Sequence, residues 1–92
     1  MSKTTVTLPE KFDISGVESI KGRLQKALEK DASTVEINAS AVEAMDSAGL
    51  QILISFDGFA RKQGKEVKII KVTDAFKTAT ELLGTKDVLP VS

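Results

Sequence analysis

The sequence predicts an α/β fold, with a mixed but mostly parallel β-sheet and three main helices. Short segments have alternating apolar and polar residues, which is typical of strands. Between them lie longer segments whose apolar residues recur every three or four positions, which is typical of helices. Strands that are joined by helices form parallel sheets with right-handed crossovers. The chain has 92 residues, no internal repeat and no Pro/Gly/Ser-rich linker, so a single domain over residues 1–92 is expected.

The N-terminal half is expected to contain two strands and the first helix. Residues 5–8 alternate Thr with Val and Leu, and this strand should end at Pro9 because proline has no N–H to donate. From Ser15 the apolar period becomes helical, and the spacing of Ser15 and Glu18 fits a capping box. Residues 34–39 place Val, Ile and Ala on one face, which predicts a strand with one buried side.

The C-terminal half is expected to continue the alternation of helices and strands. Gln63-Gly64 is a stop signal for the second helix, because glycine readily adopts the left-handed conformation that ends helices. The expected elements are a loop at 40–46, a helix at 47–62, a strand at 66–72, a helix capped by Thr73 or Asp74 that ends before Gly84, and a short strand at Val88-Leu89.

Composition excludes several classes of function. The absence of Cys and His removes disulfides, Cys/His zinc sites, imidazole bases and the common nucleophilic triads. The chain has thirteen basic and thirteen acidic residues, so its net charge is zero. We therefore expect no binding to nucleic acid or anionic lipid, which requires a strong positive field. No apolar segment approaches the roughly 18 residues of a membrane span and no signal sequence is evident, which predicts a cytoplasmic protein without membrane insertion.

The turn into the second helix carries the candidate functional site. Ser47 stands where a helix presents unpaired N–H groups and the positive end of its dipole, so a phosphate on its hydroxyl could be accommodated there. Such a phosphate would add about 1.5–2 negative charges beside Asp46 and change what a partner can contact. The alternative is that Ser or Asp serves only as a helix N-cap. Gly49 within the helix indicates close approach of another backbone, either from a partner or from a neighbouring strand.

These residues resemble the STAS domain family, whose fold is that of bacterial anti-sigma factor antagonists. The resemblance runs from Leu8 to about Gly84 and is densest in Val35-Glu36-Ile37-Asn38 and in Met45-Asp46-Ser47-Ala48-Gly49-Leu50. It implies that Ser47 is phosphorylated by a serine kinase that is itself the anti-sigma factor. It also implies that Asp46 is the acidic neighbour, and that Gly49 lets the partner close on the turn.

The N-terminus departs from the commoner pattern of this family, which has two strands before the first helix. Here only the strand at 5–8 and a loop at 9–14 precede Ser15. That shorter form is more similar to small stand-alone STAS proteins, including chemotaxis-associated ones and the cytoplasmic accessory subunit of bacterial phospholipid-trafficking ABC transporters. In the transporter type, whose partner is the ATPase subunit, the acceptor position is commonly Thr and need not be phosphorylated.

The second helix has a wider apolar face than a surface helix needs, interrupted by Asp57 and Arg61 at (i, i+4) spacing. It is either the central packed element, or part of it, including Ile52, Phe56 and Phe59, is exposed for a partner. The residues predicted to contact a partner are Asp46, Ser47, Ala48, Gly49, Leu50, Ile52 and Phe56.

Enzymatic alternatives have little support. Gly64-Lys65 lacks the first glycine of a phosphate-binding loop, and residues 5–8 lack the carboxylates of a receiver domain. Glu43 and Asp46 could mimic a catalytic pair, but no base that would activate a hydroxyl accompanies them. We therefore expect no catalytic residue, no metal site and no cofactor, and we expect a protein-interaction switch with a protein partner.

Overall fold

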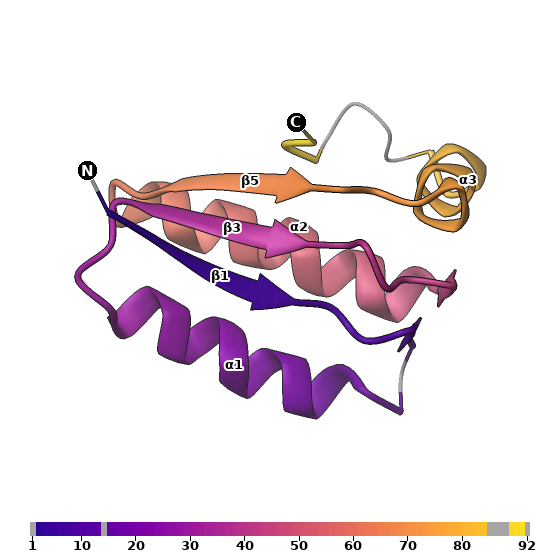
Figure 1. Cartoon of the computed structure of the whole chain (residues 1–92), viewed down its shortest axis with the longest axis horizontal. Coiled ribbons are helices and arrows are strands. Elements are labelled where there is room, and N and C mark those ends of the chain that lie inside the picture. Colours follow the sequence, from indigo (N-terminus) through magenta and orange to yellow (C-terminus); the bar gives the residue numbers. More distant parts are fainter. Residues whose placement is uncertain (1, 14, 85–88, 92) are drawn as a thin grey trace.

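The three longest strands form one parallel sheet in the computed structural model, which describes residues 2–13, 15–84 and 89–91 (Figure 1). The strands are β1 (Lys3–Thr7), β3 (Thr34–Asn38) and β5 (Glu66–Ile70), in the order β1-β3-β5. Ile37 of the central strand is opposite Val6 on one side and Ile69 on the other. The predicted α/β class with a mostly parallel sheet is confirmed.

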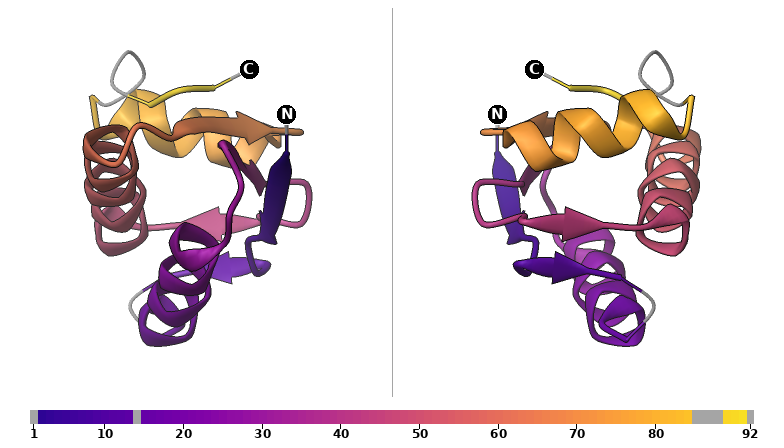
Figure 2. Two further views of the ribbon diagram at one scale, coloured as in Figure 1. Left: turned by 90° about the vertical axis from the view of Figure 1, so that its left-hand side faces the viewer. Right: turned by 90° about the vertical axis from the view of Figure 1, so that its right-hand side faces the viewer.

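Three helices accompany the sheet: α1 (Val17–Glu29), α2 (Ser47–Lys62) and α3 (Asp74–Leu82). Figures 1 and 2 show α1 and α2 on the same face of the sheet and α3 at the end toward which the strands run. This end is the carboxyl edge of the parallel sheet. It is also where α2 begins, so Ser47 and α3 lie at the same end of the molecule.

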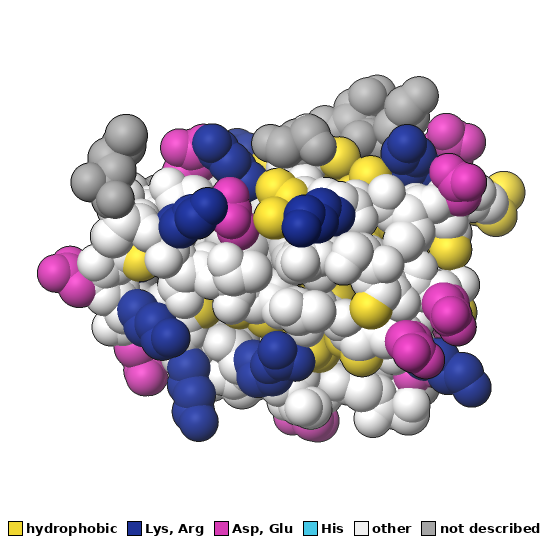
Figure 3. Space-filling model, in the orientation of Figure 1, with side chains coloured by type: hydrophobic (Ala, Val, Ile, Leu, Met, Phe, Trp, Pro, Cys, Tyr) yellow, Lys and Arg dark blue, Asp and Glu magenta, His cyan; other side chains and the backbone are white. Residues whose placement is uncertain are grey.

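The core lies between the sheet and the pair α1 and α2. The alternation within each strand sends every second side chain inward, and the apolar stripes of the helices meet them. The side chains of the core that are the largest and least exposed are Leu8, Phe12, Ile20, Val35, Ile37, Val42, Leu50, Leu53, Ile69 and Phe76. Among the described residues, no helix covers the opposite face of the sheet, where Figure 3 shows charged side chains scattered over a surface made mostly of backbone and uncharged polar side chains, with some hydrophobic atoms between them.

The ends of α2 and α3 agree with the predicted signals. Gly64, just beyond α2, has a φ of 76°, and Gly84, just beyond α3, has a φ of 70°. These left-handed conformations favour glycine. At the start of α3, Thr73 is the cap, and its hydroxyl accepts a hydrogen bond of 3.1 Å from the N–H of Phe76.

The predicted capping box at the start of α1 is wrong. The helix begins at Val17, and its N-cap is Gly16, which has no side chain to accept a bond. The Ser15 hydroxyl instead donates to Asp13 Oδ1 at 2.6 Å, and the Ser15 N–H donates to the same oxygen at 3.0 Å. The bond from the hydroxyl holds the pKa of the Asp13 carboxyl below its usual value. Because the Ser15 hydroxyl is bonded to Asp13 in this turn, it does not cap the helix.

Both segments predicted as loops, 9–14 and 40–46, contain a short strand. These strands are β2 (Lys11–Phe12) and β4 (Ala44–Met45), and they pair in parallel with each other, apart from the main sheet. Two residues are too few to produce a hydrophobic period, which explains why the sequence pattern missed them. The N-terminal segment is therefore closer to the two-strand pattern than the sequence indicated.

The C-terminal strand predicted at Val88-Leu89 is only partly testable, because Val88 lies outside the described residues. In the part that is described, Val91 makes a single parallel bridge with Ile69, and the N–H of Ile69 donates to the carbonyl of Pro90 at 2.9 Å. The described contact with β5 is thus at Val91, two residues after Leu89. Among the described residues, no helix is both long and apolar enough to cross a membrane.

Candidate functional site

Ser47 is the first residue of α2, and its side chain is exposed. The residue that caps the helix is Asp46, whose carboxylate accepts a hydrogen bond of 3.0 Å from the N–H of Gly49. Within the described residues, no hydrogen bond involves the Ser47 hydroxyl. The sequence left open whether Ser or Asp was the cap. Because Asp46 has this role, the Ser47 hydroxyl is available to solvent at the positive end of the helix dipole.

The segment before Ser47 is held by hydrogen bonds from two distant parts of the chain. The N–H groups of Glu43 and Ala44 donate to the carbonyl of Glu10 at 2.7 and 3.1 Å. From the other side, the Thr73 hydroxyl donates to the carbonyl of Val42 at 2.7 Å. The N-terminal strand segment and the start of α3 therefore both position the turn that presents Ser47.

Gly49 is explained by close approach of a backbone within the domain. Its position is buried, and a Cβ atom added there would lie 2.4 Å from the carbonyl oxygen of Phe12 and 3.1 Å from the ring. The glycine lets β2 pack directly on the first turn of α2. Between the two explanations that the sequence allowed, the neighbouring strand accounts for this glycine without a partner.

Replacement of Gly49 with Ala should therefore destabilise the protein, although alanine favours helices. We expect a loss of roughly 1–3 kcal/mol in the free energy of unfolding, since the obstacle is a backbone carbonyl that can move only with β2. Gly58 on the same helix is the matched control. A Cβ atom there meets nothing within 4 Å, so Gly58→Ala should stabilise by up to about 1 kcal/mol. Equal stabilisation by both substitutions in urea unfolding would contradict the close approach.

A hollow of about 470 Å³ lies beside the Ser47 turn, between β4 and α3. Ala44, Met45 and Asp46 line one side of it. The other side is formed by α3 and its C-terminal turn, with Leu82 81% exposed and Leu83 43% exposed. Sequence reasoning missed this part of the surface. The only available signal was the pair of leucines, Leu82 and Leu83, at the end of the third helix.

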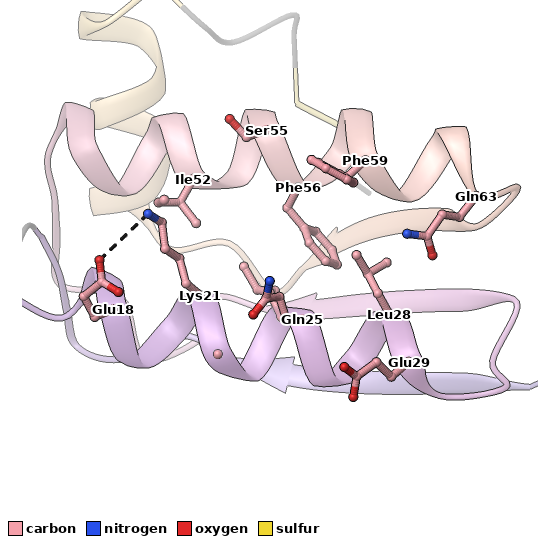
Figure 4. Close-up of a pocket in the computed structure, with 12 residues that line it drawn as sticks. Glu18, Lys21, Gln25, Leu28, Glu29, Ile52, Ser55, Phe56, Phe59 and Gln63 are labelled. Carbon is pink, nitrogen blue, oxygen red and sulfur yellow. Dashed lines mark ion pairs between the residues drawn. The ribbon is translucent and has the colours of Figure 1, made fainter.

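The remaining predicted contact residues fall into two groups. Ala48 is half-buried next to Ser47, whereas Leu50 and Phe56 are buried in the core. Ile52 is half-buried and lines, together with Phe56, a separate groove between α1 and α2 (Figure 4). The structure thus brings Asp46, Ser47 and Ala48 to one surface and places Ile52 on another.

The acidic side chains near Ser47 do not form a cluster. Among the described residues there is no cluster of three or more acidic side chains that could hold a metal ion. Glu43 is exposed, while the Asp46 carboxylate is engaged by the helix N-terminus. What the arrangement provides is an exposed hydroxyl next to a carboxylate, on a rigid turn that borders an apolar hollow.

Comparison with protein families identifies the class to which this site and fold belong. The family described as "Mlab, STAS domain" matches residues 1–90. The chain therefore belongs to the STAS domain family, as the residues around Ser47 indicated. A comparison with curated protein sequences gave no match.

Solved structures with the same fold confirm this architecture. The anti-sigma factor antagonist SpoIIAA in its unphosphorylated form aligns with a TM-score of 0.77 and 14% identity, over 99% of this chain and 80% of its own. A STAS domain protein from Planctomyces limnophilus aligns at 0.80 and 17%, over 96% and 80%. A sulfate transporter family protein from Wolinella succinogenes aligns at 0.76 and 18%, over 97% and 75%. At these identities the likeness establishes the fold.

Proposed function

We propose that this protein is a non-enzymatic interaction switch of the anti-sigma factor antagonist type, controlled by phosphorylation of Ser47. The observation that carries the proposal is the exposed Ser47 hydroxyl at the N-terminus of α2, which the capping bond of Asp46 leaves unused. SpoIIAA, which has the same fold, has been solved in both an unphosphorylated and a phosphorylated form. This role implies a serine kinase of the anti-sigma class as partner, and a cytoplasmic location.

The proposed contact surface combines the Ser47 turn with the hollow beside α3. Asp46, Ser47 and Ala48 form its polar side, and Leu82 and Leu83 form its exposed apolar side. Exposed apolar side chains next to a polar turn are the usual composition of a protein interface. A phosphate on Ser47 would stand beside the Asp46 carboxylate, where like charges would have to be desolvated when a partner closes on the turn. Phosphorylation is therefore expected to release the partner.

Substitutions at Ser47 and Asp46 distinguish a phosphorylation switch at Ser47 from a purely structural role in capping α2. Ser47→Ala should change the free energy of unfolding by less than about 0.5 kcal/mol, keep partner binding and abolish phosphorylation. Ser47→Asp should remain folded but bind the partner weakly, because it adds charge next to Asp46. Asp46→Ala should cost about 0.5–2 kcal/mol, because it removes the cap.

These effects are measured by thermal unfolding and by titration against each candidate anti-sigma kinase from the same genome. Ser33→Asp is the control, since Ser33 is exposed and precedes β3, at the opposite end of the sheet. If Ser33→Asp weakens binding as much as Ser47→Asp, a general charge effect explains the result. Intact-mass analysis of protein from its native host tests phosphorylation directly, and an active kinase with no phosphate on Ser47 would refute the switch.

The second candidate function is a constitutive subunit of a larger assembly, such as a phospholipid-trafficking ABC transporter. It is favoured by one observation: the Asp46 cap and the close packing of Gly49 on Phe12 account for the turn without any phosphate. In that case the partner is an ATPase subunit and the turn only presents a surface. Ser47→Asp and Ser47→Ala would then bind this partner with similar affinity.

A further inference from the structure

A groove of about 700 Å³ runs between α1 and α2 (Figure 4), and it shares no lining residue with the Ser47 hollow. The wall that α2 provides is uncharged, with Phe59 at its rim and 64% exposed. The wall that α1 provides is charged, with Glu18 and Lys21 toward one end and Glu29 at the other. Figure 4 shows Ile52 at the Lys21 end and Phe59 at the end of Leu28 and Glu29.

Gly22 lines the α1 wall of this groove, and none of the described residues packs against it, a property that it shares with Gly58 of α2. A Cβ atom added at Gly22 would meet nothing within 4 Å, although glycine in a helix costs up to about 1 kcal/mol relative to alanine. Gly49 is different, because the backbone of Phe12 packs directly on it. Gly22 therefore leaves open space in the wall of the groove, next to the charged side chain of Lys21.

We infer that this groove is the interface of a homodimer, in which a second copy packs with its α1 and α2 antiparallel to the first. A two-fold axis perpendicular to the helices and passing near Gln25 would place Lys21 of each copy opposite Glu29 of the other. This charged contact is favourable, and the symmetry repeats it, so that it occurs twice in the dimer. The same axis places Ile52 opposite the partner's Phe59, and Gly22 opposite the partner's Leu28.

The charge pattern is what selects a second copy as the occupant. A symmetric interface must be complementary to itself, and Lys21 and Glu29 meet this condition because they lie on either side of Gln25, each four residues away. The existing contact of Lys21 is weak: its ammonium lies 3.8 Å from the Glu18 carboxylate, which is 90% exposed. Lys21 can therefore reach a partner's carboxylate without losing a buried pair.

The size of the interface predicts a weak dimer. The 13 residues of α1 span about 20 Å, and two adjacent helices are about 20 Å wide, so each copy contributes about 400 Å². Stable interfaces bury about 800 Å² per partner. Association should therefore depend on concentration and weaken with added salt.

Charge reversal tests the symmetric arrangement, with sedimentation velocity at low salt from about 10 μM to about 1 mM as the measurement. Wild type should dimerise across this range. Lys21→Glu and Glu29→Lys should each weaken dimerisation tenfold or more, because each places like charges opposite one another twice. An equimolar mixture of these two variants should dimerise again, since one copy then carries two acidic groups and the other two basic groups. The double variant Lys21→Glu/Glu29→Lys should also recover.

Two further variants complete the test. Lys26→Glu makes the same charge change on α1 outside the lining of the groove and should dimerise like wild type. Phe59→Ala should weaken the dimer without altering the charges. A wild type that stays monomeric at about 1 mM would overturn the proposal and leave the groove to a different protein. Dimers that are insensitive to all these changes, or single variants that fail to associate when mixed, would also overturn it.

Discussion

Replacement of Phe56 with Ala is expected to lower the free energy of unfolding by about 3–5 kcal/mol, the usual cost of deleting a buried aromatic ring. The sequence placed Phe56 and Phe59 on the same wide apolar face of the second helix. In the structure, Phe56 is 7% exposed and packs in the core, whereas Phe59 is 64% exposed. Phe59→Ala should therefore stay within about 0.5 kcal/mol of wild type.

The two variants are compared by urea unfolding at low protein concentration, where the proposed dimer is dissociated and cannot add to the apparent stability of the domain. Domains of this size are stable by only about 5–15 kcal/mol, so the loss at Phe56 is a large fraction of the total. Similar losses at both positions would show that Phe59 is also buried in solution. The assignment of Phe59 to the exposed rim of the α1/α2 groove would then be wrong.

Replacement of Leu24 with Ala is expected to cost about 2–5 kcal/mol, because the leucine is 2% exposed in the interior and alanine would leave a cavity. Gln25→Ala is the control, since Gln25 is the adjacent exposed residue of the same helix. That substitution should change stability by less than about 0.5 kcal/mol. A loss below about 1 kcal/mol at Leu24, again measured by urea unfolding, would show that the face of α1 against the sheet is assigned wrongly.

Electrostatic contacts add detail that the sequence showed only in part. The predicted pair of Asp57 and Arg61 is present, with Arg61 Nε 3.2 Å from Asp57 Oδ1. The ammonium of Lys65 donates to the carbonyls of Lys30 and Ala32 at 2.9 and 2.6 Å. It ties the end of α2 to the connection between α1 and β3. Such a contact joins residues more than 30 positions apart, so no local pattern reveals it.

The sequence by itself determined the order of the main elements, the parallel sheet and most of the core. These features follow from periods of two or about 3.6 residues, which are properties of short segments and can be read without knowing what lies nearby. The signals at Gly64 and Gly84 are local in the same way, because they report the conformation of single residues. The turn at Ser47 was found for a similar reason, as one short run of residues before a helix.

The tertiary structure alone decided what surrounds that turn. The pairing of β2 with β4, the approach of Phe12 to Gly49 and the hollow completed by Leu82 and Leu83 all join segments that are far apart in the chain. It also separated Phe56 from Phe59, because a helix that is apolar over a wide arc does not specify which part of the arc meets the sheet. Packing against α1 and the strands makes that choice, since burial depends on the distances between elements rather than on the pattern within one of them.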